Sequence, residues 1–356
     1  MTKPKHLLLT AAVALLLTVS ALTTAAETPA PTVTPTPTAA PDEAPTPRPT
    51  KPPASWQDYP VFLQQYIVTE EGRHAYSAYP REQVMPHVAL YDRYAALLPK
   101  DGVVAVTYVP PSHIVTNFLR HPEPKAMESE IEPFIEALSA DNVFAFSSVE
   151  VLQKPLLSGE TLFYETDIHW TPRAAYALTE RMLAAAGETL PPYEAFPREE
   201  EFPFLGTFYR DSHADIYRDR PDTLEIVSTI HPVRVWQYSD AETCTEVPLI
   251  QKDAPSSDRY CVYLGGPGAP WTVIENDAGN GKTCLLLTDS IGLCAAPLLA
   301  EVYSRVCCYD SRTYRKYVFG PVSALFERYD VYDVYVYLNE DHALSGTMLA
   351  EAERQL

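Results

Sequence analysis

The stretch TCLLLTDSIG, residues 283–292, indicates both the fold class and the place of the predicted site. Residues 283–288 form an apolar run with the length of a buried strand, and this run ends at Asp289 and Ser290. Residues 291–300 are typical of a helix that follows the strand. A serine at such a junction lies at the carboxyl edge of a parallel sheet, where open α/β sheets place their sites.

Apolar strands and amphipathic helices alternate on both sides of this stretch. We expect further strands at residues 103–109, 143–146, 302–309 and 331–338, and helices at residues 128–138, 172–186 and 322–328. The alternation predicts an α/β domain with a largely parallel sheet flanked by helices. The helix at 172–186 has a suitable N-cap in Thr171, a proline in its first turn at Pro172, and a terminating glycine at Gly187.

Residues 191–266 do not follow this alternation. They are rich in proline, aspartate, tyrosine and β-branched residues, and the runs 223–229 and 233–238 are typical of strands. We therefore expect a β-rich insertion on the α/β core.

The first 55 residues are not expected to belong to the domain. Residues 1–26 have the order of a secretory signal: basic residues, an apolar run at 7–19, then small residues. An uncleaved N-terminal anchor is the alternative. Residues 27–55, dominated by proline and threonine, predict an extended, disordered linker. Residues 56–356 are enough for one large domain, and the signal predicts a secreted or cell-surface protein.

Charge and cysteine content exclude some classes of partner. The net charge of -20 makes nucleic acid an unsuitable partner, because nucleic acid binding requires clustered lysine and arginine. All six cysteines follow residue 240, and Cys244 and Cys261 flank a predicted hairpin where they could pair. The other four lie in or beside apolar runs, which also suit buried free thiols. No pair has the spacing of a zinc site.

Two polar residues near the middle of the chain complete the predicted site. The segment TDIHWTP, residues 166–172, directly precedes a predicted helix. Residues two apart in an extended backbone point to the same side, so Asp167 can accept a hydrogen bond from Nδ1 of His169. That bond leaves Nε2 free to take a proton from a nucleophile. The sequence therefore predicts a Ser290–His169–Asp167 triad for covalent catalysis.

The segment TDIHWTP resembles the corresponding motif of the alginate O-acetyltransferase-like SGNH proteins and of the DHHW family of exported bacterial proteins. Further elements appear in the same order as in those families: FLGTFY at 204–209, PDT at 221–223, DSIG at 289–292 and EVY at 301–303. Ile168 stands where the DHHW pattern has a second histidine, and Leu293 lies where family members often have a polar residue.

The resemblance implies an SGNH-hydrolase-like fold and an exported serine esterase or O-acetyltransferase that acts through an acyl-enzyme. Its substrate would be an envelope or exported polysaccharide, or another acylated carbohydrate, with a membrane protein as a conceivable acetyl donor. No cofactor is expected. The same analogy assigns Gly206, and with it Gly292, to the oxyanion or substrate-binding region. Trp170 could form a wall of the site.

Two other classes of function remain open. A metal-dependent hydrolase would draw on Asp211, His213, Asp215 and residues 340–342 beside the triad, but no recognised ligand spacing unites these residues, and we expect no metal. A non-catalytic glycan-binding or envelope-assembly protein could have the same fold, with its 23 tyrosines and 4 tryptophans as stacking surfaces.

Overall fold

The computed structural model describes residues 66–69, 72–75, 86–110, 112, 138, 140–264, 271–344 and 347–356. The signal and linker predicted for residues 1–55, and all but the last residue of the helix predicted at 128–138, lie outside these residues. Among the helices of the described segments, none is long and apolar enough to cross a membrane.

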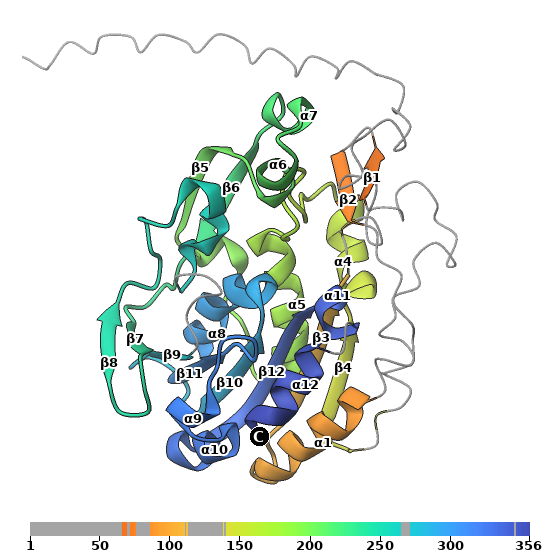
Figure 1. Cartoon of the computed structure of the whole chain (residues 1–356). Helices are drawn as coiled ribbons and strands as arrows, with labels where there is room; N and C mark the ends of the chain where they lie inside the picture. The colour runs from red at the N-terminus through yellow and green to blue at the C-terminus, as the bar shows by residue number, and fades with distance from the viewer. Residues whose placement is uncertain are drawn as a thin grey trace, which may run out of the picture. The chain divides into compact units, whose positions relative to one another are not determined.

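An eight-stranded sheet forms the centre of the domain (Figure 1). Its strands, in spatial order, are β4 (Val143–Ser147), β3 (Val104–Val109), β12 (Val331–Asn339), β10 (Thr283–Thr288), β11 (Arg305–Tyr309), β9 (Trp271–Glu275), β7 (Arg234–Tyr238) and β8 (Cys244–Val247). The first five strands run parallel, and the last three are antiparallel to their neighbours. The predicted, largely parallel α/β sheet is confirmed.

The region predicted as a β-rich insertion is divided between two sheets. Strand β5 (Arg198–Phe204) pairs with β6 (Asp222–Val227) in a separate two-stranded sheet. Strands β7 and β8 instead continue the central sheet, because β9 pairs antiparallel with β11 and offers its other edge to β7. Strand β9 is not among the strands that the sequence predicts, so the structure differs here from the expected insertion. Another small hairpin joins β1 (Tyr66–Thr69) to β2 (Gly72–Ala75).

Helices cover both faces of the central sheet (Figure 1). One face packs against α1 (Pro86–Leu97), α10 (Val322–Tyr329) and α12 (Thr347–Gln355). The other packs against α4 (Ser148–Leu157), α5 (Pro172–Ala185) and α8 (Ala296–Val302). The short helices are η6 (Tyr193–Ala195), α6 (Thr207–Ser212), α7 (Asp215–Arg218), η7 (Ser256–Val262), η9 (Ser290–Ala295), α9 (Lys316–Phe319) and α11 (Glu340–Leu344).

Strand β10 is buried on both faces because it lies in the middle of the sheet. Leu285 and Leu287 belong to the core under α1, α10 and α12, whereas Cys284 and Leu286 belong to the core under α4, α5 and α8. This double burial explains the continuous apolar run in the sequence. All six cysteines are free, with Cys244 exposed, so the structure contains no Cys244–Cys261 disulfide.

The helix expected at 291–300 begins one residue earlier and has two parts. Residues 290–295 form the 3₁₀ helix η9, and the α-helix α8 starts only at Ala296, with Pro297 in its first turn. Gly292 has no room for a side chain: an added Cβ would lie 2.3 Å from Thr288 Oγ1 and 2.5 Å from Tyr337 Cβ. The tighter 3₁₀ winding therefore brings the residues after Ser290 close against the sheet.

Replacing Leu286 with alanine tests how much the central strand contributes to stability. Leu286 is fully buried, so Leu286→Ala should lower the free energy of unfolding by about 2–5 kcal/mol through lost burial and a cavity. Leu157 is 63% exposed and provides a matched control, because Leu157→Ala should change stability by no more than about 0.5 kcal/mol. Urea denaturation of both variants measures the difference, and equal effects would contradict the burial of β10.

Candidate functional site

Asp167 and His169 form a buried pair in the segment that precedes α5. His169 donates from its backbone N to Asp167 Oδ1 at 2.8 Å, and its Nδ1 is also hydrogen bonded to Oδ1. The side chains of both residues are at most 5% exposed. The hydrogen bond inferred from the Asp-x-His spacing is present, and it orients the imidazole so that Nε2 points away from the carboxylate.

The other oxygen of Asp167 is held by the start of α6. Thr207 donates to Oδ2 from its backbone N at 2.7 Å and from its hydroxyl at 3.3 Å. Burial raises the pKa of Asp167, but the charge of His169 and the hydrogen bonds from His169 and Thr207 outweigh it, so this pKa lies below its usual value. Asp167 is therefore ionised and can stabilise an imidazolium at His169.

Tyr260, in η7, packs against one face of the His169 imidazole. Sequence reasoning missed this residue. Its ring is stacked on that of His169, with centroids 3.9 Å apart and 10° between the planes. Its hydroxyl donates to Cys294 Sγ at 3.1 Å and to Ile291 O at 3.5 Å. The hydroxyl thus reaches η9, the helix that begins at Ser290. No motif marks Tyr260, because its 91-residue separation from His169 is closed only by the tertiary fold.

Trp170 links the histidine segment directly to the serine helix. Its indole Nε1 donates to Ile291 O at 2.6 Å. The donor residue follows His169 and the acceptor residue follows Ser290, so the two predicted segments meet at this bond. Trp170 is fully buried, and its role is a bridge inside the protein rather than a wall open to solvent.

Ser290 occupies the first position of η9 and is partly exposed. Among the described residues, Nε2 of His169 has no hydrogen-bond partner, although it is shielded from solvent. No hydrogen bond therefore joins it to the Ser290 hydroxyl here. Such bonds are often long before substrate binds. A buried, unpaired imidazole nitrogen is costly, and this atom is the one that a general base needs to have available.

The glycines assigned by analogy have steric roles in the structure. The N–H of Gly206 donates to Thr166 Oγ1 at 3.0 Å, so it is engaged and not available as an oxyanion donor. A Cβ on Gly206 would lie 2.1 Å from Asp167 Oδ2. Gly206 therefore allows α6 to approach Asp167, just as Gly292 allows η9 to approach the sheet.

Asp222 binds the segment that directly precedes Asp167 and His169. Its carboxylate accepts hydrogen bonds from the backbone N of Glu165 at 3.0 Å and of Thr166 at 2.7 Å, and from the Thr166 hydroxyl at 2.7 Å. The sequence analysis had noted Asp222 only as part of PDT. Because Asp222 is the first residue of β6, these hydrogen bonds connect the β5–β6 sheet to the site.

The residues considered for metal binding do not gather. Asp211 pairs with Arg210, Asp215 pairs with Arg218, and His342 pairs with Asp289. Within the described segments, no group of three or more histidine, cysteine, aspartate or glutamate side chains is placed to hold a metal ion. The metal-dependent alternative gains no support from the geometry.

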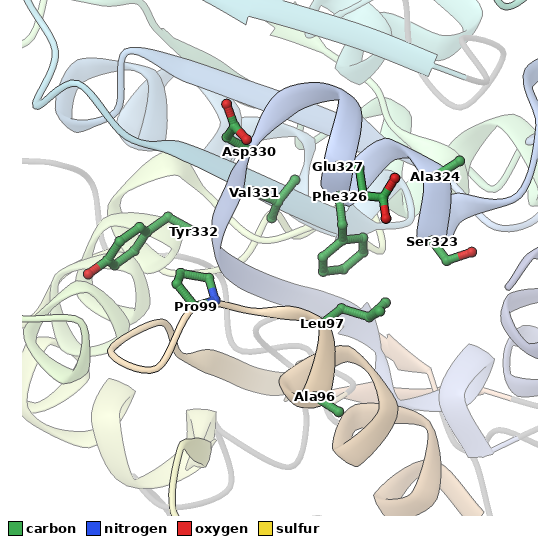
Figure 2. Close-up of a pocket in the computed structure, with 10 residues that line it drawn as sticks. All are labelled: Ala96, Leu97, Pro99, Ser323, Ala324, Phe326, Glu327, Asp330, Val331 and Tyr332. Atoms are coloured by element: carbon green, nitrogen blue, oxygen red, sulfur yellow. The ribbon is translucent and has the colours of Figure 1, made fainter.

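A hollow of about 740 Å³ lies at the opposite edge of the sheet (Figure 2). It is lined by the end of α1, by residues of α10 and by the start of β12, including Leu97, Phe326 and Val331. Val331 begins β12, whereas Ser290 follows the end of the parallel strand β10. This hollow contains none of the predicted site residues.

Two family models match overlapping parts of the chain. Residues 73–202 match the model described as the SGNH hydrolase-like domain of the acetyltransferase AlgX. Residues 150–309 match the model of the DHHW protein. Both matches are similarities over part of the chain. Together the two models include Asp167, His169 and Ser290, and the resemblance seen in the sequence is confirmed.

Solved structures confirm the SGNH-like fold. A DHHW family protein from Eubacterium siraeum is 18% identical with a TM-score of 0.66, over 82% of this chain and 95% of that one. PatB1 of Bacillus cereus is 16% identical with a TM-score of 0.61, over 78% of this chain and 96% of that one. A second PatB1 structure contains a sulfonyl adduct. No curated protein matches the sequence.

Replacing Gly206 with alanine tests the contact between α6 and Asp167 in this SGNH-like site. The new Cβ would overlap Asp167 Oδ2, so the carboxylate or the helix has to move, and Gly206→Ala should cost about 1–3 kcal/mol of stability. The Thr207 amide, which donates to Asp167, should exchange with solvent faster than in the unmodified chain. Unchanged exchange and an unchanged free energy of unfolding would contradict this close approach.

Proposed function

We propose that this chain is a serine-dependent O-acetyltransferase or esterase in which Ser290 is the nucleophile, His169 the general base and Asp167 the residue that orients it. The observation that carries the proposal is the buried His169 imidazole, with Nδ1 bound to Asp167 and Nε2 unpartnered. The Trp170–Ile291 hydrogen bond supports it, because it holds the histidine segment against the helix that begins at Ser290.

The reaction has two half-reactions in which His169 carries the proton. In the first, Nε2 takes the proton of the Ser290 hydroxyl while Oγ forms a bond to the carbonyl carbon of an acetyl ester. The intermediate collapses by breaking the bond to the donor oxygen, which receives the proton from His169. In the second, an acceptor hydroxyl loses its proton to His169 and bonds to the acetyl carbon; the bond to Ser290 Oγ then breaks, and Oγ takes the proton back from His169. Asp167 stabilises the imidazolium formed in each half-reaction.

The acceptor separates the two activities. Water as the acceptor gives an esterase, and a sugar hydroxyl gives an O-acetyltransferase. The description of the matching family as an acetyltransferase domain favours the second activity. The resemblance noted in the sequence implies a carbohydrate as the acceptor. We place this reaction on an exported or envelope polysaccharide, in line with the signal predicted at residues 1–26. A membrane protein would then be a suitable source of the acetyl group.

Labelling with phenylmethylsulfonyl fluoride or a fluorophosphonate tests the nucleophile. Ser290 should form the adduct, and Ser290→Ala should abolish it, because the Ser290 hydroxyl is the proposed nucleophile. Ser147 is the matched control: it too lies at the junction of a central strand and a helix, as the last residue of β4, but it accepts a hydrogen bond from Glu150 N as an ordinary helix cap. Ser147→Ala should label at the original rate. Intact-protein mass spectrometry reads both results, and equal labelling of all three proteins would disprove the assignment.

The rate of this labelling should depend on pH in a defined direction. His169 has to be neutral to accept the serine proton, so the rate should fall as the solution becomes acidic. His169→Ala should lower the rate and remove this dependence. A His169→Ala protein that labels at the original rate would contradict a histidine base. Incubation with an acetyl ester should add one acetyl group to Ser290, and transfer of that group to a glycan would identify the transferase.

A further inference from the structure

The carboxylate of Asp289, next to the proposed nucleophile, is the meeting point of three segments. Oδ1 accepts from Ile291 N at 2.9 Å and so caps η9. Oδ2 accepts from Asn339 N, at the end of β12, at 2.9 Å, and from His342 Nδ1, in α11, at 2.7 Å. Asp289 therefore fixes the turn that contains Ser290 to the end of the neighbouring strand and to the following helix.

His342 is the side-chain donor to Asp289 in this arrangement. The Asp289 side chain is fully buried, whereas that of His342 is 42% exposed. Burial raises the pKa of Asp289, but its hydrogen bond with His342 and the charges of His342 and Arg312 outweigh that effect, so the pKa lies below its usual value. Arg312 is itself paired with Asp310, and the negative charges of Asp310 and Asp289 repel each other. His342 is thus the histidine that binds the ionised Asp289 directly.

We propose that His342 is a positioning residue for Ser290 and acts through Asp289. The inference rests on the proposed function and adds a second histidine with a different task. His342 donates from Nδ1 to the carboxylate in both its neutral and its protonated form, so its role does not require it to lose a proton. Without this donor, the Asp289 carboxylate keeps two backbone donors among the described residues, and the buried charge would draw in water and shift the turn.

The sequence alone suggests a different role for His342. In the sequence, residues 340–342 are conceivable metal ligands beside the triad, because carboxylates and imidazoles suit divalent ions. The structure instead directs Nδ1 of His342 to Asp289, across 53 residues of sequence. A small displacement of a nucleophile lowers a reaction rate strongly, so a residue that only holds the turn in place can have a large effect.

The test compares His342→Ala with His342→Gln. Glutamine offers a side-chain N–H donor and cannot act as a general base, so it should restore most of what alanine removes. His231 provides a matched control, because it forms the same kind of pair: its side chain is 52% exposed and its Nδ1 is bound to the buried Glu301. None of the hydrogen bonds of Glu301 involves Asp289 or Ser290.

The expected result is a loss of serine reactivity that exceeds the loss of folding. His342→Ala should lower the rate of Ser290 labelling, and kcat on an acetyl ester, on the order of 10- to 100-fold with KM nearly unchanged. His342→Gln should come within a few-fold of the original rate and keep the fall of rate in acid that His169 causes. His231→Ala should label at the original rate. Thermal melting of all three variants checks that they are folded.

Each contrary outcome has a separate meaning. Labelling that is unaffected in a folded His342→Ala protein overturns the positioning role while leaving the proposed function intact. Loss of all labelling in a folded His342→Gln protein also overturns it, because His342 would then be needed as a base. If His342→Ala does not fold, the glutamine variant and its labelling rate decide the question. Failure of the unmodified chain to label at Ser290 refutes the proposed function itself.

Discussion

The burial of the Asp167 carboxylate is the constraint on which the geometry of the site depends. A carboxylate removed from water has to be satisfied by hydrogen bonds, and here the donors come from two separate segments. His169 supplies its backbone N and its Nδ1, and Thr207 supplies its backbone N and its hydroxyl. Both segments are therefore held together around one charge, and the imidazole has a single orientation. Gly206 makes this possible, because any larger residue would occupy the space of the carboxylate.

The carboxylate of Asp289, next to Ser290, is held in the same way as that of Asp167. It too is fully buried, and its donors also come from separate parts of the chain. The two clusters are joined by the indole of Trp170 and the hydroxyl of Tyr260, which both reach Ile291 O. The site is thus supported by two buried carboxylates and a small number of aromatic side chains. Rigid support of this kind suits chemistry that depends on the placement of a few atoms.

Much of the central sheet could be predicted from the sequence, because its strands are buried on both faces and therefore read as continuous apolar runs. The bounds of β10 were predicted without error, and those of β12 and α5 to within one residue at their ends. The antiparallel edge was not predicted. Strand β9 is short and lies next to a glycine-rich segment, so its place beside β11 depends on pairing with a strand that follows it by some 30 residues.

The sequence by itself determined the Asp167–His169 pair, because an extended backbone puts residues two apart on the same side. It also determined the serine at the end of a buried strand, because such a strand has to leave the sheet at its carboxyl edge. Only the tertiary structure decided what surrounds them: Tyr260 on the imidazole, Thr207 and Gly206 at Asp167, Asp222 beneath the segment, and His342 at Asp289. These contacts close loops of 39 to 91 residues. Local backbone geometry cannot predict which residues meet over such separations in sequence. Those contacts are set when the core packs, because buried charges need hydrogen-bond donors and buried rings need packing partners.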